Sequence, residues 1–156
     1  AAQQCVGLTE KEVIVVPTAT VPQGISAMMA VDPDNDDPQA ILAAMTEAAA
    51  NVTTAQITYA ARNSDFDGFA INEGDYLALL DGKLFGTERD ITSLLTRLAA
   101  LAAEREAAFV TLFYGEGVSQ EEAEAAQALF TEACPETEVS LLSGGQPVYY
   151  YTISIE

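Results

Sequence analysis

The sequence predicts an α/β fold, in which helices pack against a mixed β-sheet. Apolar residues recur at helical spacing in several segments, and short β-rich runs alternate with these segments. The pair Asp81-Gly82 separates two β-rich runs and is typical of a hairpin with a type I′ turn. The 156 residues suit one domain or two small lobes, and a chain of this length buries roughly 68–70% of its unfolded surface. We therefore expect a stable core.

The first predicted elements are a strand and a short helix. The run Glu12–Val16 is rich in β-branched residues and ends at Pro17, which is typical of a buried strand. A turn over residues 21–24 then leads to a short helix over residues 26–31. Because an exposed strand edge drives pairing, we expect this strand to be covered by the domain's own helices or paired with a second copy in a homodimer.

An acidic stretch, residues 32–37, predicts the internal boundary of the chain. It contains four aspartates, and it divides the chain into a first segment, 1–36, and a second lobe, 37–156. Its Asp-x-Asp-x-Asp start resembles a calcium loop, but Asp37 stands where glycine is required and Ala43 where glutamate is required. We therefore expect a solvated linker and no metal site.

Capping residues mark the helices of the second lobe. Asp37 precedes Pro38 in the manner of an N-cap, Asp90 opens the next helix, and Ser119 forms a capping box with Glu122. Apolar stripes follow these starts, and β-rich runs lie between them. In order, we expect a helix over 38–52, strands over 56–62, 76–80 and 83–85, a helix over 90–102, a strand over 108–114, a helix over 119–133, and strands over 138–143 and 148–155.

Composition excludes several classes of function. Six Lys and Arg residues oppose 24 Asp and Glu residues, which gives a net charge of −18 and an isoelectric point near 4.1. Without a basic patch to neutralise phosphates, binding to nucleic acid or to an anionic membrane is excluded. The chain has no histidine, which is the usual general base and the commonest ligand of transition metals. Ser-His-Asp and Cys-His catalysis are therefore excluded, and we expect no cofactor.

The cysteines and the apolar runs bear on location. Cys5 and Cys134 lie far apart in the chain without a CxxC motif, which argues against a zinc site or a redox dithiol. No run approaches the ~18 apolar residues of a membrane span, and residues 1–10 lack the features of a signal peptide. We therefore expect a soluble, cytoplasmic protein.

Three local patterns are weaker candidates for a site. Gly82-Lys83 lacks the surrounding motif of a phosphate loop and is explained by the hairpin. Alternation along Tyr149-Tyr150-Tyr151 is typical of sheet packing, with an aromatic binding face as the alternative. Paired carboxylates can do acid and base work, but clusters of acids arise by chance in so acidic a chain. The clustered acids are Asp65, Asp67, Glu73 and Asp75.

Two loops contain more turn residues than their connections need, which favours a role in recognition. The loops are residues 16–24 and 143–147, and each holds an amide side chain between a proline and a glycine. This pattern predicts a rigid backbone with a hydrogen-bonding tip. We predict that these loops, with an arginine from a neighbouring strand end, bind a protein partner. The predicted binding residues are Pro22, Gln23, Gly24, Arg62, Gly145, Gln146 and Pro147.

The same loops carry a family resemblance that extends over nearly the whole chain. The most specific motifs are PTATVPQG over 17–24 and GGQPVYYYTIS over 144–154. Together with the segments around them, these motifs resemble the C-terminal part of the ATP-dependent subunit of bacterial fatty acid kinases, whose members are also described as dihydroxyacetone-kinase-like or DAK-phosphatase-domain proteins. The matching segments are residues 13–33, 56–83, 109–124 and 143–156.

The resemblance implies both a fold and a function. It implies a DegV-like second lobe with a mixed sheet over 37–156, preceded by a remnant of the first lobe over 1–36. In the family an N-terminal domain binds ATP and Mg²⁺, and no residue of that site is present here. The resemblance therefore implies a non-catalytic domain of a fatty acid kinase, which docks a DegV-like fatty-acid-binding carrier protein.

The sequence departs from the carriers at one informative place. DegV-like carriers hold the fatty-acid carboxylate with Ser and Thr hydroxyls of the first lobe and a Thr-His-Thr-Gly-type segment of the second. At what looks like the corresponding place this chain has SGGQP over 143–147, without that histidine or those threonines. We therefore do not expect carboxylate capture. The alternatives are a stand-alone domain that binds lipids or small acids, and an enzyme that uses carboxylates.

Overall fold

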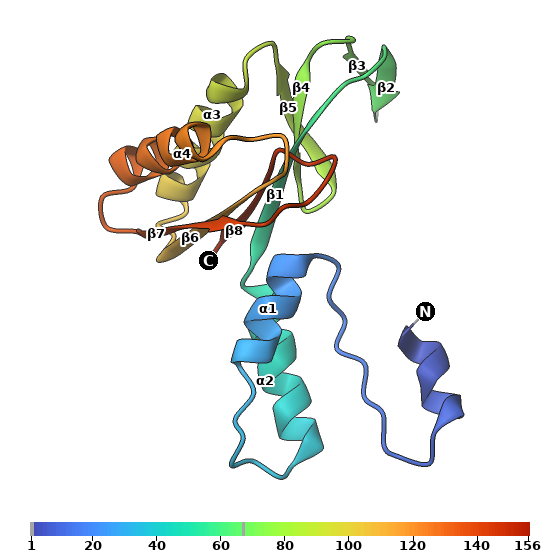
Figure 1. Cartoon of the computed structure of the whole chain (residues 1–156). Helices are drawn as coiled ribbons and strands as arrows, with labels where there is room; N and C mark the ends of the chain where they lie inside the picture. Colours follow the sequence, from blue (N-terminus) through green and yellow to red (C-terminus); the bar gives the residue numbers. More distant parts are fainter. Residues whose placement is uncertain (1, 67) are drawn as a thin grey trace. The chain divides into compact units, whose positions relative to one another are not determined.

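The computed structural model describes residues 2–66 and 68–156 and divides into two compact units, Ala1–Val52 and Thr53–Glu156 (Figure 1). The boundary expected after residue 36 lies inside the first unit, because the helices on either side of it pack against each other. Among the described residues, no helix combines the length and the apolar character that a membrane crossing requires.

The first unit contains three helices: η1 (Ala2–Leu8), a 3-10 helix, and the α-helices α1 (Val21–Met29) and α2 (Pro38–Ala50). The two α-helices pack against each other. Asp37 caps α2 as predicted, because its carboxylate accepts a hydrogen bond from the Gln39 amide at 3.0 Å. Buried alanines, Ala27 and Ala49, let the two helices approach closely.

Two predictions for this unit are wrong. Glu12–Val16 is coil rather than strand, because no described segment pairs with it and a strand needs a neighbour for its hydrogen-bond ladder. Residues 21–24 do not form a turn that precedes a helix; they are the first turn of α1. Pro22 lies in that first turn, where the missing N–H has no intrahelical partner in any case.

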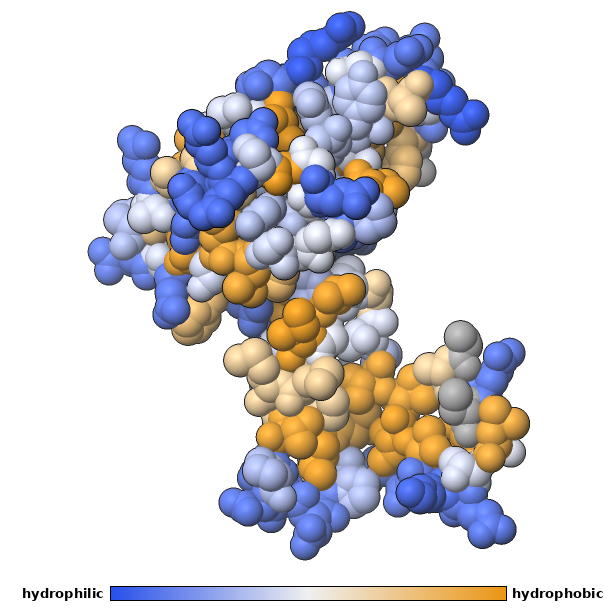
Figure 2. Space-filling model, viewed as in Figure 1, coloured by the Kyte–Doolittle hydropathy of each residue, from blue (hydrophilic) through white to orange (hydrophobic). Residues whose placement is uncertain are grey.

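Apolar side chains are exposed on α1 and gather on the surface of the first unit (Figure 2). Val21, Ile25 and Met28 follow one another at helical spacing, so they share one side of the helix. Val21 is 73% exposed and Met28 71% exposed. The described residues of the first unit therefore leave this side of α1 largely uncovered.

The second unit contains eight strands and two helices among its described residues. They are β1 (Thr53–Tyr59), β2 (Ser64–Phe66), β3 (Phe69–Ile71), β4 (Tyr76–Leu80), β5 (Lys83–Glu88), α3 (Ile91–Glu104), β6 (Phe109–Tyr114), α4 (Gln120–Ala133), β7 (Glu138–Ser143) and β8 (Tyr151–Ile155). Six strands form one sheet in the order β5-β4-β1-β8-β6-β7, in which β6 and β7 are parallel and the other neighbours antiparallel. The predicted α/β class with a mixed sheet is confirmed.

Helices α3 and α4 lie side by side against the sheet (Figure 1). Helix α3 packs on β4 and β5, whereas α4 packs on β6 and β7. The core between the helices and the sheet is fully buried at its centre, which includes Ile57, Leu98, Leu112, Phe130 and Ile153. This arrangement brings the amino-terminal ends of both helices near the strand ends that carry the candidate site.

Local signals in the second unit are largely confirmed. Asp81 and Gly82 have φ values of 48° and 80°, as the predicted type I′ turn requires. Strand β8 begins at Tyr151 rather than at the predicted Val148, because Val148 has a positive φ of 73° that interrupts the extended backbone. The small hairpin of β2 and β3 has no counterpart among the predicted elements, since three-residue strands are too short to show a period of two.

Candidate binding site at the ends of the parallel strands

The candidate site begins where the parallel strands β6 and β7 end. Carboxyl ends of parallel strands meet at one edge of a sheet, which is a common place for binding sites. The following loops are joined there by backbone hydrogen bonds: the Gly115 amide donates to the Tyr150 carbonyl at 2.9 Å, and the Glu116 amide donates to the Gln146 carbonyl at 3.2 Å. The loop after β6 and the loop after β7 therefore form one connected surface.

Two glycines permit this close approach. A Cβ atom on Gly115 would collide with the carbonyl oxygen of Tyr149 and would lie 2.7 Å from that of Gln146. A Cβ atom on Gly144 would collide with the Oε1 atom of Gln146. These contacts explain why SGGQP is rich in glycine, and they require no ligand.

Gln146 lies inside the loop rather than at its tip. Its Nε2 atom donates to the carbonyl of Phe113 at 2.9 Å, and the side chain is half-buried. Gly145, with a φ of 59°, and Pro147 are both exposed beside it. Among the predicted binding residues of this loop, the exposed surface thus belongs to Gly145 and Pro147, while Gln146 braces the backbone.

The remaining predicted residues lie elsewhere. Pro22 is buried, and the Oε1 atom of Gln23 accepts a hydrogen bond from the Ala19 amide at 2.9 Å, so this amide side chain also serves its own helix start. Gly24 lies in the same turn of α1, in the first unit. Arg62 is exposed after β1 in the second unit and has no ion-pair partner among the described residues. The structure thus brings together Gly145, Gln146 and Pro147, but it does not join them with the other four.

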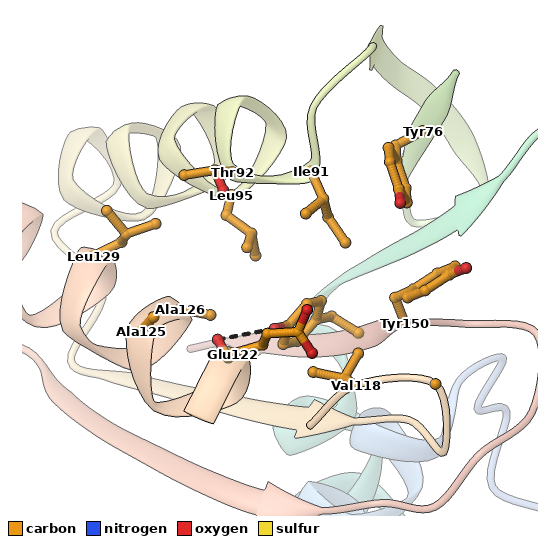
Figure 3. Close-up of a pocket in the computed structure, with 12 residues that line it drawn as sticks. Tyr76, Ile91, Thr92, Leu95, Val118, Glu122, Ala125, Ala126, Leu129 and Tyr150 are labelled. Carbon is orange, nitrogen blue, oxygen red and sulfur yellow. Dashed lines mark hydrogen bonds between the residues drawn. The ribbon is translucent and has the colours of Figure 1, made fainter. Parts of the chain in front are cut away.

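Two cavities open beside this edge, and they share Gly117 and Tyr150. The smaller has a volume of about 210 Å³ and is lined by Gln146 and Val148 among others. The larger has a volume of about 290 Å³ and lies between α3 and α4 (Figure 3). Leu95 reaches it from α3 and Leu129 from α4, so much of its wall is apolar.

Tyrosines form one side of the larger cavity. The rings of Tyr76 and Tyr150 meet edge to face with centroids 5.5 Å apart, and Tyr59 meets Tyr76 in the same way at 5.5 Å. The Tyr151 hydroxyl donates to the Glu122 carbonyl at 3.3 Å. Burial raises the pKa of Tyr151 to about 12, with a smaller contribution from the Glu122 carboxylate. Burial likewise raises the pKa of Tyr76, so these phenols are neutral hydrogen-bond donors at physiological pH.

Glu122 brings a carboxylate to the wall of the larger cavity. It stands in the first turn of α4, and its Oε2 atom accepts hydrogen bonds from the Ser119 amide at 2.9 Å and the Ser119 hydroxyl at 2.7 Å. These bonds lower the pKa of Glu122, so the group is anionic at neutral pH. None of the described residues that line the cavity is Lys or Arg. A fatty-acid carboxylate would therefore meet repulsion here.

The predicted acid cluster does not form an open carboxylate pair among the described residues. Asp75 is 5% exposed, and its Oδ1 atom lies 2.9 Å from Nε of Arg89, while Asn72 donates to its Oδ2 atom. Asp65 accepts a bond from the Gly68 amide, and Asp67 lies outside the described residues. In the part of the chain that the structure describes, no three potential metal ligands gather.

The sequence indicates part of this site. Tyr150 and Tyr151 belong to the aromatic alternative, and Glu122 belongs to the predicted capping box. The cavity itself is not predicted, because it exists only where α3, α4 and the strand-end loops approach one another. The signal available in sequence is a capping-box glutamate followed by alanines, which leave room beside the helix.

Comparisons with known proteins agree with this geometry. A family model for the C-terminal region of FakA-like proteins, which belong to fatty acid kinase, matches residues 1–156. Protein YloV of Bacillus subtilis is 37% identical over the whole chain, and an uncharacterized protein of Staphylococcus aureus is 29% identical over the same span. The chain spans 28% of the length of each of these relatives.

Solved structures share the fold at low sequence identity. The DegV family protein Cg2579 from Corynebacterium glutamicum is 14% identical with a TM-score of 0.69, over 99% of this chain and 67% of that one. The Streptococcus pneumoniae fatty acid kinase B3 protein, solved with linoleic acid, is 9% identical with a TM-score of 0.51, over 76% of this chain and 49% of that one. These likenesses show that the fold is DegV-like.

Proposed function

Because the chain belongs to the family of FakA-like C-terminal domains of fatty acid kinase, we propose that it docks a DegV-like fatty-acid-binding carrier protein on behalf of a larger kinase protein. Its match to the family model over all 156 residues is the observation that carries this proposal. The chain covers 28% of its longer relatives, which leaves room for an ATP domain elsewhere in the whole protein. Under this proposal the domain works in the cytoplasm beside its carrier.

The domain itself has no part in phosphoryl transfer under this proposal. Its sequence contains no phosphate loop and two lysines, Lys11 and Lys83. Calorimetry with ATP and magnesium tests the point: we expect no saturable binding by the isolated chain. Saturable binding would contradict a non-catalytic role.

The charge of the chain supports a basic partner surface. A net charge of −18 steers a basic protein toward this one and raises the association rate at low salt more than the final affinity. Neutral, shape-specific contacts must then hold the complex. The strand-end loop offers such contacts, since Gly145 and Pro147 are exposed on a backbone that Gln146 braces.

We extend the proposed interface to all seven predicted residues. Arg62 offers an exposed guanidinium, whereas Gln23 and Gln146 act by holding their turns in shape. The segments 1–36 and 37–156 remain our interpretation as the remnant of a first lobe and a second lobe. Docking to a carrier of the same fold requires no carboxylate-binding group on this chain.

Surface plasmon resonance with the DegV-like carriers of the same organism tests docking. We expect saturable binding in the micromolar range or tighter, with an association rate that falls as salt is added. An unrelated basic protein is the control, because electrostatic steering alone would attract it as well. Equal binding of the carrier and the control protein would refute specific docking.

A homodimer is a separate part of the proposal. The coil over Glu12–Val16 and the exposed apolar side of α1 offer surface that a second copy could cover. Light scattering of the whole chain at several concentrations tests it. A monomer at every concentration would contradict the homodimer without affecting carrier docking.

A stand-alone lipid- or acid-binding domain is the second candidate, favoured by the apolar cavity of about 290 Å³. Against it stands Glu122, the ionised group of that cavity, because an acid ligand would be desolvated beside a like charge. Native mass spectrometry of the purified chain separates the candidates. A stoichiometric acyl adduct would favour lipid binding over docking.

A further inference from the structure

The cavity between α3 and α4 combines an apolar wall with a small volume. Ile91 and Leu95 of α3 face Leu129 of α4 across it, and Val118 closes another side (Figure 3). Its volume of about 290 Å³ lies at the lower end of the range of ligand pockets. The cavity therefore suits a short alkyl chain or a single ring rather than a long acyl chain.

The polar groups of this cavity are of one electrostatic kind. Glu122 points into it, and its Oε1 atom makes no hydrogen bond with another described residue, while Oε2 is held by Ser119 (Figure 3). The backbone amides of the first turn of α4 and the Ser119 hydroxyl hold the charge on the carboxylate. A fixed negative charge with one unused oxygen thus lies beside apolar surface.

The tyrosines reinforce this preference. Tyr76 and Tyr150 line the cavity with aromatic rings, which attract cations through their electron-rich faces. Their hydroxyls accept as well as donate hydrogen bonds. Asp90, at the start of α3, adds negative charge near Tyr76. A cation would find a carboxylate and two aromatic rings, whereas the described residues that line the cavity supply no positive charge to an anion.

We propose that this cavity binds an organic cation of the alkylammonium class, with its short apolar stem between α3 and α4 and its charged head beside Glu122 and the tyrosines. The stem gains from leaving water, and the ammonium replaces part of its hydration with Oε1 of Glu122. Cation binding here does not depend on carrier docking, because it involves the cavity rather than the exposed loop tip.

A matched series of ligands tests the chemical class. Hexylammonium, 1-hexanol and hexanoate share one stem and differ in the head group, and each is titrated into the whole chain at low salt by calorimetry. We expect hexylammonium to bind at least tenfold more tightly than 1-hexanol and hexanoate not to bind. Binding of hexanol or hexanoate as tight as that of hexylammonium, or no binding of hexylammonium, would overturn the proposal.

A matched pair of variants tests the site. Glu122→Gln removes the charge but keeps the capping box, since glutamine also serves at this helix position. Glu121→Gln removes the same charge from the adjacent exposed residue, which does not line the cavity. We expect Glu122→Gln to weaken hexylammonium binding at least tenfold and Glu121→Gln to weaken it less than twofold. Equal effects would show general attraction to an acidic protein and overturn the proposal.

The location of the bound stem gives an independent readout. Methyl NMR signals of Ile91, Leu95 and Leu129 should shift on titration with hexylammonium, because these side chains surround the cavity. Methyl groups on the exposed side of α1 serve as the control, since none of the residues that line the cavity belongs to that helix. Shifts confined to α1 would place the ligand on exposed apolar surface and contradict the cavity.

Discussion

Ser119 and Glu122 bond each other in both directions at the start of α4. The Ser119 amide and hydroxyl donate to Oε2 of Glu122 at 2.9 and 2.7 Å, and the Glu122 amide donates to Oγ of Ser119 at 3.3 Å. The same carboxylate lines the cavity beside the strand-end loops. The pair therefore begins the helix and also places a fixed negative charge at the candidate site.

Replacing the serine should weaken the helix start. Ser119→Ala removes both hydroxyl bonds of the capping box, and we expect the free energy of unfolding to fall by about 1 kcal/mol. Urea unfolding followed by circular dichroism measures this change. Ser93→Ala is the control, because Ser93 also donates a hydroxyl bond at a helix start but is not the N-cap. A loss for Ser93→Ala as large as that for Ser119→Ala would contradict a specific role of the cap.

The two helix-start carboxylates predict a pH dependence of stability. Hydrogen bonds from Ser93 lower the pKa of Asp90, and hydrogen bonds from Ser119 lower the pKa of Glu122. Because the folded pKa lies below the unfolded one, each group stabilises the fold fully above its unfolded pKa, and this contribution is lost as the pH falls through the folded value.

We therefore expect the free energy of unfolding to decrease from about pH 6 to about pH 3. Asp90→Asn should reduce that decrease, since asparagine still caps a helix but does not titrate. Urea unfolding at several pH values checks the prediction. A variant with the same pH dependence as the wild type would show that other acids govern the acid response.

Local signals could be predicted from sequence because their causes are local. The N-caps at Asp37, Asp90 and Ser119 and the turn at Asp81-Gly82 depend on a few neighbouring residues, and the structure has all of them. A strand depends on a partner elsewhere in the chain. The β-branched run Glu12–Val16 has the composition of a strand, but it lacks a described partner and remains coil.

The site could be predicted only in part, for the same reason. The surplus of turn residues after β7 indicates the strand-end loop. It does not indicate the direction of the Gln146 side chain, because that depends on the carbonyl of Phe113 on another strand. The cavity needs α3 and α4 to meet, and no pattern within either helix reports that contact.

Two glycine substitutions should have opposite effects. Gly115→Ala would place a Cβ against backbone carbonyls of Tyr149 and Gln146, so we expect a loss of at least about 2 kcal/mol of stability. Gly24 lies inside α1, and no other part of the described protein comes within 4 Å of the place where a Cβ atom would lie. Gly24→Ala should therefore stabilise that helix by about 0.5–1 kcal/mol.

Hydrogen exchange separates the two effects, because it reports each unit by itself. We expect amides of β6 and β8 to exchange faster in Gly115→Ala and amides of α1 to exchange more slowly in Gly24→Ala. Unchanged exchange in Gly115→Ala would mean that the strand-end loops can move apart at little cost. The close packing of these loops would then not be required for the fold.

The last prediction concerns carrier docking at the strand-end loop. Val148 is 73% exposed and has a positive φ of 73°, which is strained for a β-branched residue. Val148→Gly should therefore raise stability by about 1 kcal/mol while removing an apolar side chain from the proposed interface. We expect affinity for the DegV-like carrier to fall several-fold by surface plasmon resonance, although the fold becomes more stable.

Opposite signs for stability and affinity are what distinguish a contact from a fold effect. Phe109→Ala is the matched control, because Phe109 is 53% exposed at the amino-terminal end of β6, whereas the loop lies at the carboxyl ends of the parallel strands. We expect it to leave carrier affinity unchanged. If Val148→Gly keeps full affinity and Phe109→Ala loses it, the carrier docks at the other end of the sheet, because a contact made by the loop tip cannot survive loss of its most exposed apolar side chain.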